Sequence, residues 1–202
     1  MPVKNIKSML RSVAATASLL VCCASAHAGL VDNGGFETQD FSGWNASIDS
    51  VWDGVDGQSP QSGNYSAFFG SSSTSTISQT LSTIAGRTYY VSFWLKNEED
   101  VNGVANPNSF QFAWDGTTVL AVSDESAFDY KQYGFFVDAT GATTDLSFSF
   151  IQQVAFWDFD SVDVHIPEPN ELALAGLAGA LAFFASKRRR REEALPDASA
   201  SA

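Results

Sequence analysis

Between residues 66 and 164 the chain repeatedly alternates apolar and polar positions. In the segment 88–96, Tyr89, Val91, Phe93 and Leu95 fall on one face and the residues between them on the other. A period of two with aromatic and β-branched side chains predicts a β-strand. The same pattern predicts about eight strands: Ser66–Phe69, Ser75–Leu81, Thr88–Lys96, Ser109–Asp115, Thr117–Val122, Tyr133–Val137, Leu146–Phe150 and Asp158–Val164.

Clusters of Gly, Asn, Asp and Ser separate these strands and mark the turns. Asp115-Gly116 joins two of the strands directly and predicts a tight hairpin, because both turn residues need positive φ. No helical periodicity of useful length appears before residue 167. The pattern therefore predicts an all-β fold, an antiparallel β-sandwich of the jelly-roll type, as one domain over residues 29–166.

The first 28 residues have the layout of an export signal. A positive region, an apolar region and a small-residue cleavage site follow one another: Lys4, Lys7 and Arg11, then Val13–Cys23, then Ala26-His27-Ala28. Ala26 and Ala28 are the small residues that signal peptidase requires at its cleavage site. We therefore expect the mature chain to begin at Gly29.

A second apolar segment lies near the C-terminus. Leu172–Ala185 carries no charge; Pro167-Glu168-Pro169 precedes it, and a basic block follows, consisting of Lys187, Arg188, Arg189, Arg190 and Arg191. A helix over this segment, at about 1.5 Å per residue, is short for a hydrocarbon core about 30 Å thick. The basic block would hold its end on the cytoplasmic side. These features favour a temporary stop in the membrane over a permanent anchor.

In its parts and their order, this C-terminal segment resembles the PEP-CTERM sorting tail of Gram-negative bacteria. The resemblance implies that an exosortase recognises and cleaves residues 167–191 after transient insertion into the inner membrane. The body would then reach the cell surface or the extracellular matrix. Residues 192–202, acidic and rich in Ala and Ser, are expected to be a disordered cytoplasmic tail that is lost on cleavage. The alternative is an ordinary C-terminal anchor that contains Pro-Glu-Pro by chance.

Removing both ends changes what the composition implies. The only cysteines, Cys22 and Cys23, lie in the signal, so the exported body has no disulfide despite its oxidising destination. Residues 29–166 carry three basic side chains against eighteen Asp and Glu, a formal charge of −15. Such a surface repels nucleic acid phosphates, which excludes nucleic acid as a partner. Divalent cations and neutral glycans remain compatible partners.

Few residues are available for catalysis. His165 is the one histidine left after processing and no cysteine remains, which excludes serine or cysteine triads and histidine-based zinc sites. Carboxylate pairs of the glycosidase kind are compatible with the composition. A sandwich of this size, however, has little room for a catalytic cleft and its walls. We therefore expect the body to have no enzymatic activity.

Short motifs stand at both ends of the body and in its middle. They are Asn33-Gly34-Gly35-Phe36-Glu37, Ser62-Gly63-Asn64-Tyr65-Ser66 and Asp158-Phe159-Asp160-Ser161-Val162-Asp163-Val164. Together they resemble the galactose-binding-like jelly rolls, including the carbohydrate-binding modules attached to xylanases. One departure is Phe159, which stands where that family often has the first aspartate of its terminal strand.

The resemblance also implies a structural calcium ion. Matched residue by residue, Glu37 and Asp160 would be its carboxylate ligands, with backbone oxygens of the segments 33–35 and 62–64 as further ligands. Calcium takes six to eight oxygen ligands and tolerates irregular loops, so this chemistry is reasonable. In the alternative interpretation, both carboxylates accept backbone N–H groups at strand ends and no metal binds.

Sugar binding requires an aromatic ring for the apolar face of a pyranose, with amides or carboxylates around it. Of the five tryptophans most are expected in the core, Trp94 and Trp114 among them. Trp52 is the better candidate, because it precedes the loop-like segment 53–57, rich in Gly and Asp. Trp157, where a strand begins, is the second candidate.

The sequence thus predicts an exported, non-enzymatic surface or matrix protein whose jelly roll binds an exopolysaccharide or another glycan. One alternative is a structural coat or scaffold protein without a ligand. Another is a small polysaccharide-active enzyme.

Overall fold

The computed structural model describes residues 29–99, 107–153 and 155–167. The predicted signal with Ala26 and Ala28, the tail from Glu168 and Pro169 through Arg188–Arg191, and residues 192–202 lie outside this part. Of the sorting motif, the structure describes only Pro167, which is buried and lies two residues after the end of β10 at His165. The described residues include no helix long and apolar enough to cross a membrane.

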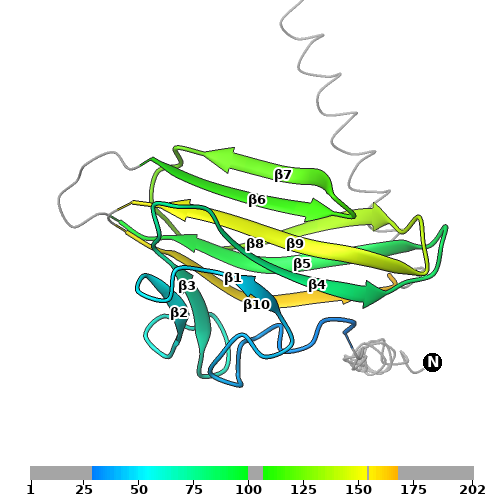
Figure 1. Cartoon of the computed structure of the whole chain (residues 1–202), viewed down its shortest axis with the longest axis horizontal. Helices are drawn as coiled ribbons and strands as arrows, with labels where there is room; N and C mark the ends of the chain where they lie inside the picture. The colour runs from blue at the N-terminus through cyan, green and yellow to red at the C-terminus, as the bar shows by residue number, and fades with distance from the viewer. Residues whose placement is uncertain (1–28, 100–106, 154, 168–202) are drawn as a thin grey trace, which may run out of the picture.

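The described chain forms ten strands in two antiparallel five-stranded sheets (Figure 1). The first sheet has the order β1-β4-β9-β6-β7 and the second the order β2-β3-β10-β5-β8. The strands are β1 (Asn45–Ser47), β2 (Asp53–Asp56), β3 (Ser66–Phe69), β4 (Ser75–Ser82), β5 (Thr88–Asn97), β6 (Asn108–Trp114), β7 (Thr117–Ser123), β8 (Phe128–Asp138), β9 (Thr143–Gln152) and β10 (Trp157–His165). The predicted antiparallel β-sandwich is confirmed.

Each of the eight segments with period-two patterns forms a strand, although the predicted segment Ser109–Asp115 extends one residue beyond the end of β6. The Asp115-Gly116 hairpin joins β6 to β7. Both turn residues have positive φ, 50° and 73°, as a two-residue hairpin of this type requires.

The strand β2 corrects the expectation of a loop over 53–57. Its four residues, Asp-Gly-Val-Asp, have a turn-like composition but pair with β3 from Asp53 opposite Phe69 to Asp56 opposite Ser66. Gly54 leaves room for the ring of Phe68 on the neighbouring strand, because a Cβ there would lie 2.8 Å from Cζ of Phe68 and the ring would have to shift. The close approach of this ring to the β2 backbone is therefore one that a glycine favours.

Aromatic rings fill the space between the two sheets. The ring of Phe93 in β5 lies near the centre, with its centroid 5.2 Å from that of Phe148 in the first sheet and 5.5 Å from that of Phe159 in β10. Phe69 and Phe150 stack across the two sheets at 3.8 Å. With no cysteine in the body, this close-packed aromatic layer replaces disulfides as the source of stability.

The N-terminal segment of the body lies against β10. Leu30 N donates to Val164 O at 2.9 Å, and Val162 N donates to Gly34 O at 2.8 Å. A Cβ on Gly34 would lie 2.0 Å from Val162 O, so this close approach requires glycine. The contact carries Phe36 into the core and brings Glu37 to the end of the second sheet that holds Asp160.

The central position of Phe93 gives a first prediction. Phe93→Ala should lower the free energy of unfolding by about 3–5 kcal/mol, because it leaves a cavity between the sheets. Phe136→Ala on the neighbouring strand β8 is the matched control, since Phe136 is 42% exposed, and it should cost far less. Urea unfolding of the mature protein measures both. Equal losses in the two variants would contradict this assignment of the core.

Candidate functional site

The turn between β1 and β2 presents Trp52 to solvent, with 54% of the residue exposed. The turn is tightly hydrogen-bonded. Trp52 N and Asp53 N donate to Asp49 O at 3.0 and 2.8 Å, and Val51 N donates to the Asp49 side chain at 3.0 Å. Gly70 N donates to Trp52 O at 3.0 Å. These backbone hydrogen bonds therefore fix the turn that exposes the Trp52 side chain to solvent.

A buried carboxylate lies directly beneath this turn. Asp53 is 5% exposed and accepts hydrogen bonds from Asp49 N at 2.9 Å, from Gly70 N at 3.0 Å and from Ser71 N at 3.2 Å. The hydroxyl of Ser75 is a further donor. Several donors compensate the cost of burying this charge, and they tie the Trp52 turn to the β3–β4 connection.

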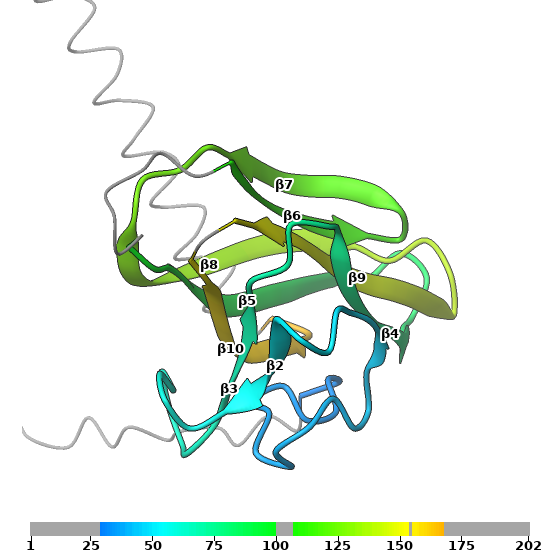
Figure 2. The ribbon, with the colours of Figure 1, turned by 60° about the vertical axis from the view of Figure 1, so that its left-hand side comes forward.

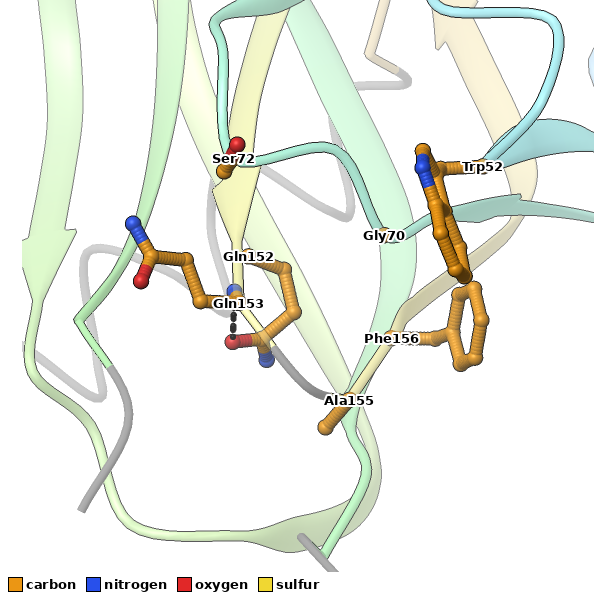
Figure 3. Close-up of a pocket in the computed structure, with 7 residues that line it drawn as sticks. All are labelled: Trp52, Gly70, Ser72, Gln152, Gln153, Ala155 and Phe156. Carbon is orange, nitrogen blue, oxygen red and sulfur yellow. Dashed lines mark hydrogen bonds between the residues drawn. The ribbon is translucent and has the colours of Figure 1, made fainter. Parts of the chain in front are cut away.

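Beside Trp52 lies a pocket of about 550 Å³. It is lined by Trp52, Gly70, Ser72, Gln152, Gln153, Ala155 and Phe156. Figure 3 shows the rings of Trp52 and Phe156 close together on one side, and the side chains of Gln152 and Gln153 on the other. A Cβ on Gly70 would lie 2.3 Å from Cε1 of Phe156, so this glycine leaves the space in which the Phe156 ring lies.

The amide of Gln152 is fixed by protein contacts. Gln152 is 1% exposed; its Nε2 donates to Asn97 Oδ1 at 2.7 Å, and its Oε1 accepts from Gln153 N at 3.0 Å. Gln152 N also donates to Ser71 O at 2.9 Å. Gln152 therefore positions the pocket wall, whereas the neighbouring Gln153 is exposed. The pocket thus combines aromatic surface with amide and hydroxyl groups.

The prediction that Trp157, the second candidate, stacks on a sugar is wrong, because this residue is buried. It is 0% exposed, its Nε1 donates to Ile151 O at 3.0 Å, and it packs against Phe110 and Phe128. The reason is the phase of β10, in which Trp157 and Phe159 both point into the core. The residue before them, Phe156, takes the outward position and lines the pocket.

The expectation for Trp114 is confirmed and that for Trp94 is corrected. Trp114 is buried, and its Nε1 donates to Asp138 O at 2.9 Å. Trp94 is half-buried, because it shares a strand with the inward-pointing Phe93 and Leu95 and therefore lies on the opposite face.

Glu37 and Asp160 both bind the segment 61–65. Glu37 Oε1 accepts from Asn64 N at 2.8 Å and from Tyr65 N at 3.1 Å. Asp160, fully buried, accepts at Oδ2 from Gln61 N and from Ser62 N, each at 3.0 Å. The N–H of Asn64 lowers the pKa of Glu37, and burial raises the pKa of Asp160 against the effect of its own hydrogen bonds.

Gly35 lies between the two side chains. A Cβ on Gly35 would lie 3.8 Å from Asp160 Oδ1 and 3.9 Å from Cγ of Glu37. Carboxylate oxygens are ligands that calcium accepts. Both carboxylates accept hydrogen bonds from backbone N–H groups, as the alternative interpretation without a metal expects. The described residues include no group of three or more His, Cys, Asp or Glu that could hold a metal ion. Calcium binding stays a prediction.

A second charged group lies on the outer face of the second sheet. Lys96 Nζ donates to Asp158 Oδ2 at 2.9 Å, to Glu98 Oε1 at 3.0 Å and to Ser59 Oγ at 2.7 Å. Burial raises the pKa of Asp158 to about 6, against the opposing effect of the Lys96 ammonium. No local sequence pattern indicates this cluster, because Lys96 and Asp158 are 62 residues apart in the chain.

No protein-family model and no curated protein matches this sequence. Solved structures match it by fold. TmCBM61, solved in complex with β-1,4-galactotriose, superposes with a TM-score of 0.54 at 20% identity, over 69% of this chain and 99% of that chain. A xylan-binding domain of CBM 22 has a TM-score of 0.50 at 14% identity, over 69% of this chain and 96% of that chain.

A third similar structure belongs to a larger protein. The enzymatically active domain of tailspike protein 4 of bacteriophage CBA120 has a TM-score of 0.50 at 16% identity, over 69% of this chain and 21% of that chain. At such identities the likeness is one of fold. The body has the jelly-roll fold of carbohydrate-binding modules, which confirms the predicted resemblance of the fold.

The calcium prediction is tested by chelation. A cation that binds the native state alone stabilises it, so removing calcium with EGTA should lower the melting temperature of the mature protein. Glu37→Gln and Asp160→Asn should each abolish that sensitivity, whereas Asp145→Asn on the first sheet should keep it. Melting curves that coincide with and without EGTA would leave the two carboxylates as acceptors of backbone N–H groups.

Proposed function

We propose that this protein is an exported, non-catalytic carbohydrate-binding protein of the cell surface or extracellular matrix. The observation that carries the proposal is the pocket at Trp52, where an exposed indole on a rigid turn lies beside the ring of Phe156. The fold that the body shares with carbohydrate-binding modules supports it.

The chemistry of the pocket suits a sugar. The apolar face of a pyranose packs on an aromatic ring, and its hydroxyl groups need amide or hydroxyl partners close by. Trp52 and Phe156 supply the rings, and Gln153 and Ser72 supply the polar groups. About 550 Å³ lies within the range of small-molecule sites. Because Asp53 fixes the turn beforehand, little conformational entropy is lost when a ligand orders Trp52.

The residues that line this pocket suit binding better than catalysis. They are aromatic rings, amides, a serine and small residues, and none of these lining side chains is a carboxylate or an imidazole. General acid–base chemistry on a glycosidic bond uses a pair of carboxylates beside the bond. Two experiments on the mature protein test the alternatives. A glycan array without any bound glycan would indicate a ligand-free scaffold protein. Release of reducing sugars from extracellular polysaccharide would indicate a small polysaccharide-active enzyme.

Export and processing belong to the same proposal. Residues 1–28 would direct the chain through the inner membrane and be removed by signal peptidase after Ala28. The tail 167–191 would hold the chain there until an exosortase cleaves it. In support, β10, the last strand of the described residues, ends at His165, two residues before the sorting motif begins.

The role of Trp52 is tested by truncation. Trp52→Ala should weaken glycan binding about ten-fold or more, in line with the loss of about 1–3 kcal/mol from one desolvated aromatic contact. Its melting temperature should change little, because the side chain is exposed. Val51→Ala is the matched control on the same turn, as Val51 is 75% exposed and does not line the pocket. Unchanged affinity for Trp52→Ala in calorimetry would remove the proposed platform.

The processing of the tail is tested by mass. The intact mass of the extracellular protein should correspond to a chain that begins at Gly29 and lacks Arg188–Arg191. Glu168→Ala should impair cleavage, because Glu168 is the one charge between two rigid prolines and offers a receptor a defined group. Retention of the arginines in the mature protein would contradict the model of exosortase processing.

A further inference from the structure

A second, smaller hollow adjoins the Trp52 pocket. It measures about 180 Å³ and is lined by Asp56, Gln58, Ser59, Phe68, Glu98, Phe156 and Asp158. Phe156 lines both hollows, so the ring that bounds the first pocket also bounds the second. Residues in or next to β2, β3 and β10 line both hollows, and these three strands follow one another in the second sheet (Figure 2).

Two glycines make the aromatic wall of this path possible. The rings of Phe68 and Phe156 meet edge to face, with centroids 5.7 Å apart and an interplanar angle of 80°. A Cβ on Gly54 would lie 2.8 Å from Phe68, and a Cβ on Gly70 would lie 2.3 Å from Phe156. The Phe68 ring therefore lies against the backbone of the edge strand β2, and the Phe156 ring lies against the backbone directly after β3. Aromatic side chains thus continue from Trp52 past Phe156 to Phe68.

The second hollow differs from the first in its charge. Asp56, Glu98 and Asp158 line it, and the nearby cation is Lys96. The three N–H groups of that ammonium are matched by three acceptors, at Asp158, Glu98 and Ser59. Lys96 therefore fixes two of the carboxylates and leaves no donor for a ligand. The hollow presents acceptor oxygens and a net negative charge.

We propose that this hollow is a second subsite of the glycan-binding site, for the sugar unit next to the one on Trp52. This subsite binds a sugar unit through the hydrogen-bond donors of that sugar. It binds an amine-bearing sugar more tightly than a neutral one, and it excludes uronic acids. This inference rests on the proposed function. The formal charge of −15 over residues 29–166 acts in the same direction, since it repels acidic polysaccharides before they reach the site.

The test compares three trimers with one backbone geometry, the β-1,4-linked trimers of glucosamine, glucose and glucuronic acid. Calorimetry on the mature protein at low salt should rank their affinities in that order. Asp56→Asn should reduce the preference for glucosamine over glucose by about three- to ten-fold, the range of one partly screened charge pair. Asp145→Asn, the same charge change on the first sheet, should leave the ranking and the ratio unchanged.

A second variant tests the aromatic path. Phe68→Ala should weaken binding of the glucose trimer while leaving the binding of glucose itself unchanged, because a single sugar on Trp52 does not reach the second hollow. Equal affinities for the three trimers, together with no effect of Asp56→Asn or Phe68→Ala, would overturn the second subsite even where Trp52→Ala still weakens binding. Failure of all three trimers to bind, together with no binding on a glycan array, would overturn the proposed function and this inference with it.

Discussion

Buried aspartates hold the loops of this sandwich to its second sheet. A carboxylate out of water is stable only where several donors surround it. Asp53 gathers N–H groups from the Trp52 turn and from the β3–β4 connection, Asp160 gathers those of Gln61 and Ser62, and Asp158 holds Lys96. The contacts of Asp53 and Asp160 fix loop segments, whereas that of Asp158 joins β10 to Lys96 on the neighbouring strand β5.

Both hollows of the candidate site depend on these carboxylates. Asp53 sets the backbone that presents Trp52, and the Asp158–Lys96 pair forms the charged wall behind Phe156. Because the scaffold is hydrogen-bonded before any ligand arrives, the aromatic rings are already in place. Preorganisation of this kind suits a binding protein, whose affinity comes from shape and contact rather than from chemical change.

The stability of the body comes from aromatic packing. The rings of Phe93, Phe148 and Phe159 meet between the sheets, and the close stack of Phe69 on Phe150 joins β3 to β9. Such a core needs no disulfide, which agrees with a body that has no cysteine. The acidic side chains of the body give its surface a negative charge that repels anionic polymers.

The sequence by itself determined the sandwich, because a period of two and the turn residues are local properties of the chain. Eight of the ten strands and the hairpin at Asp115-Gly116 follow from that pattern. Trp52 is exposed as expected, but the segment after it is a strand and not the predicted loop. Only the tertiary structure decided which face of β10 points inward. A period of two says which residues share a face but not which face is buried, so the order of Phe156 and Trp157 could not be predicted.

The pocket around Trp52 could not be predicted from the sequence either. The strand β2 pairs with β3, with the ring of Phe68 close to Gly54. The pocket forms where the β1–β2 turn, the β3–β4 connection and the end of β9 meet. These contacts join residues that are far apart in the chain. The packing of the two sheets sets the geometry of these contacts, and a local sequence pattern does not predict that packing.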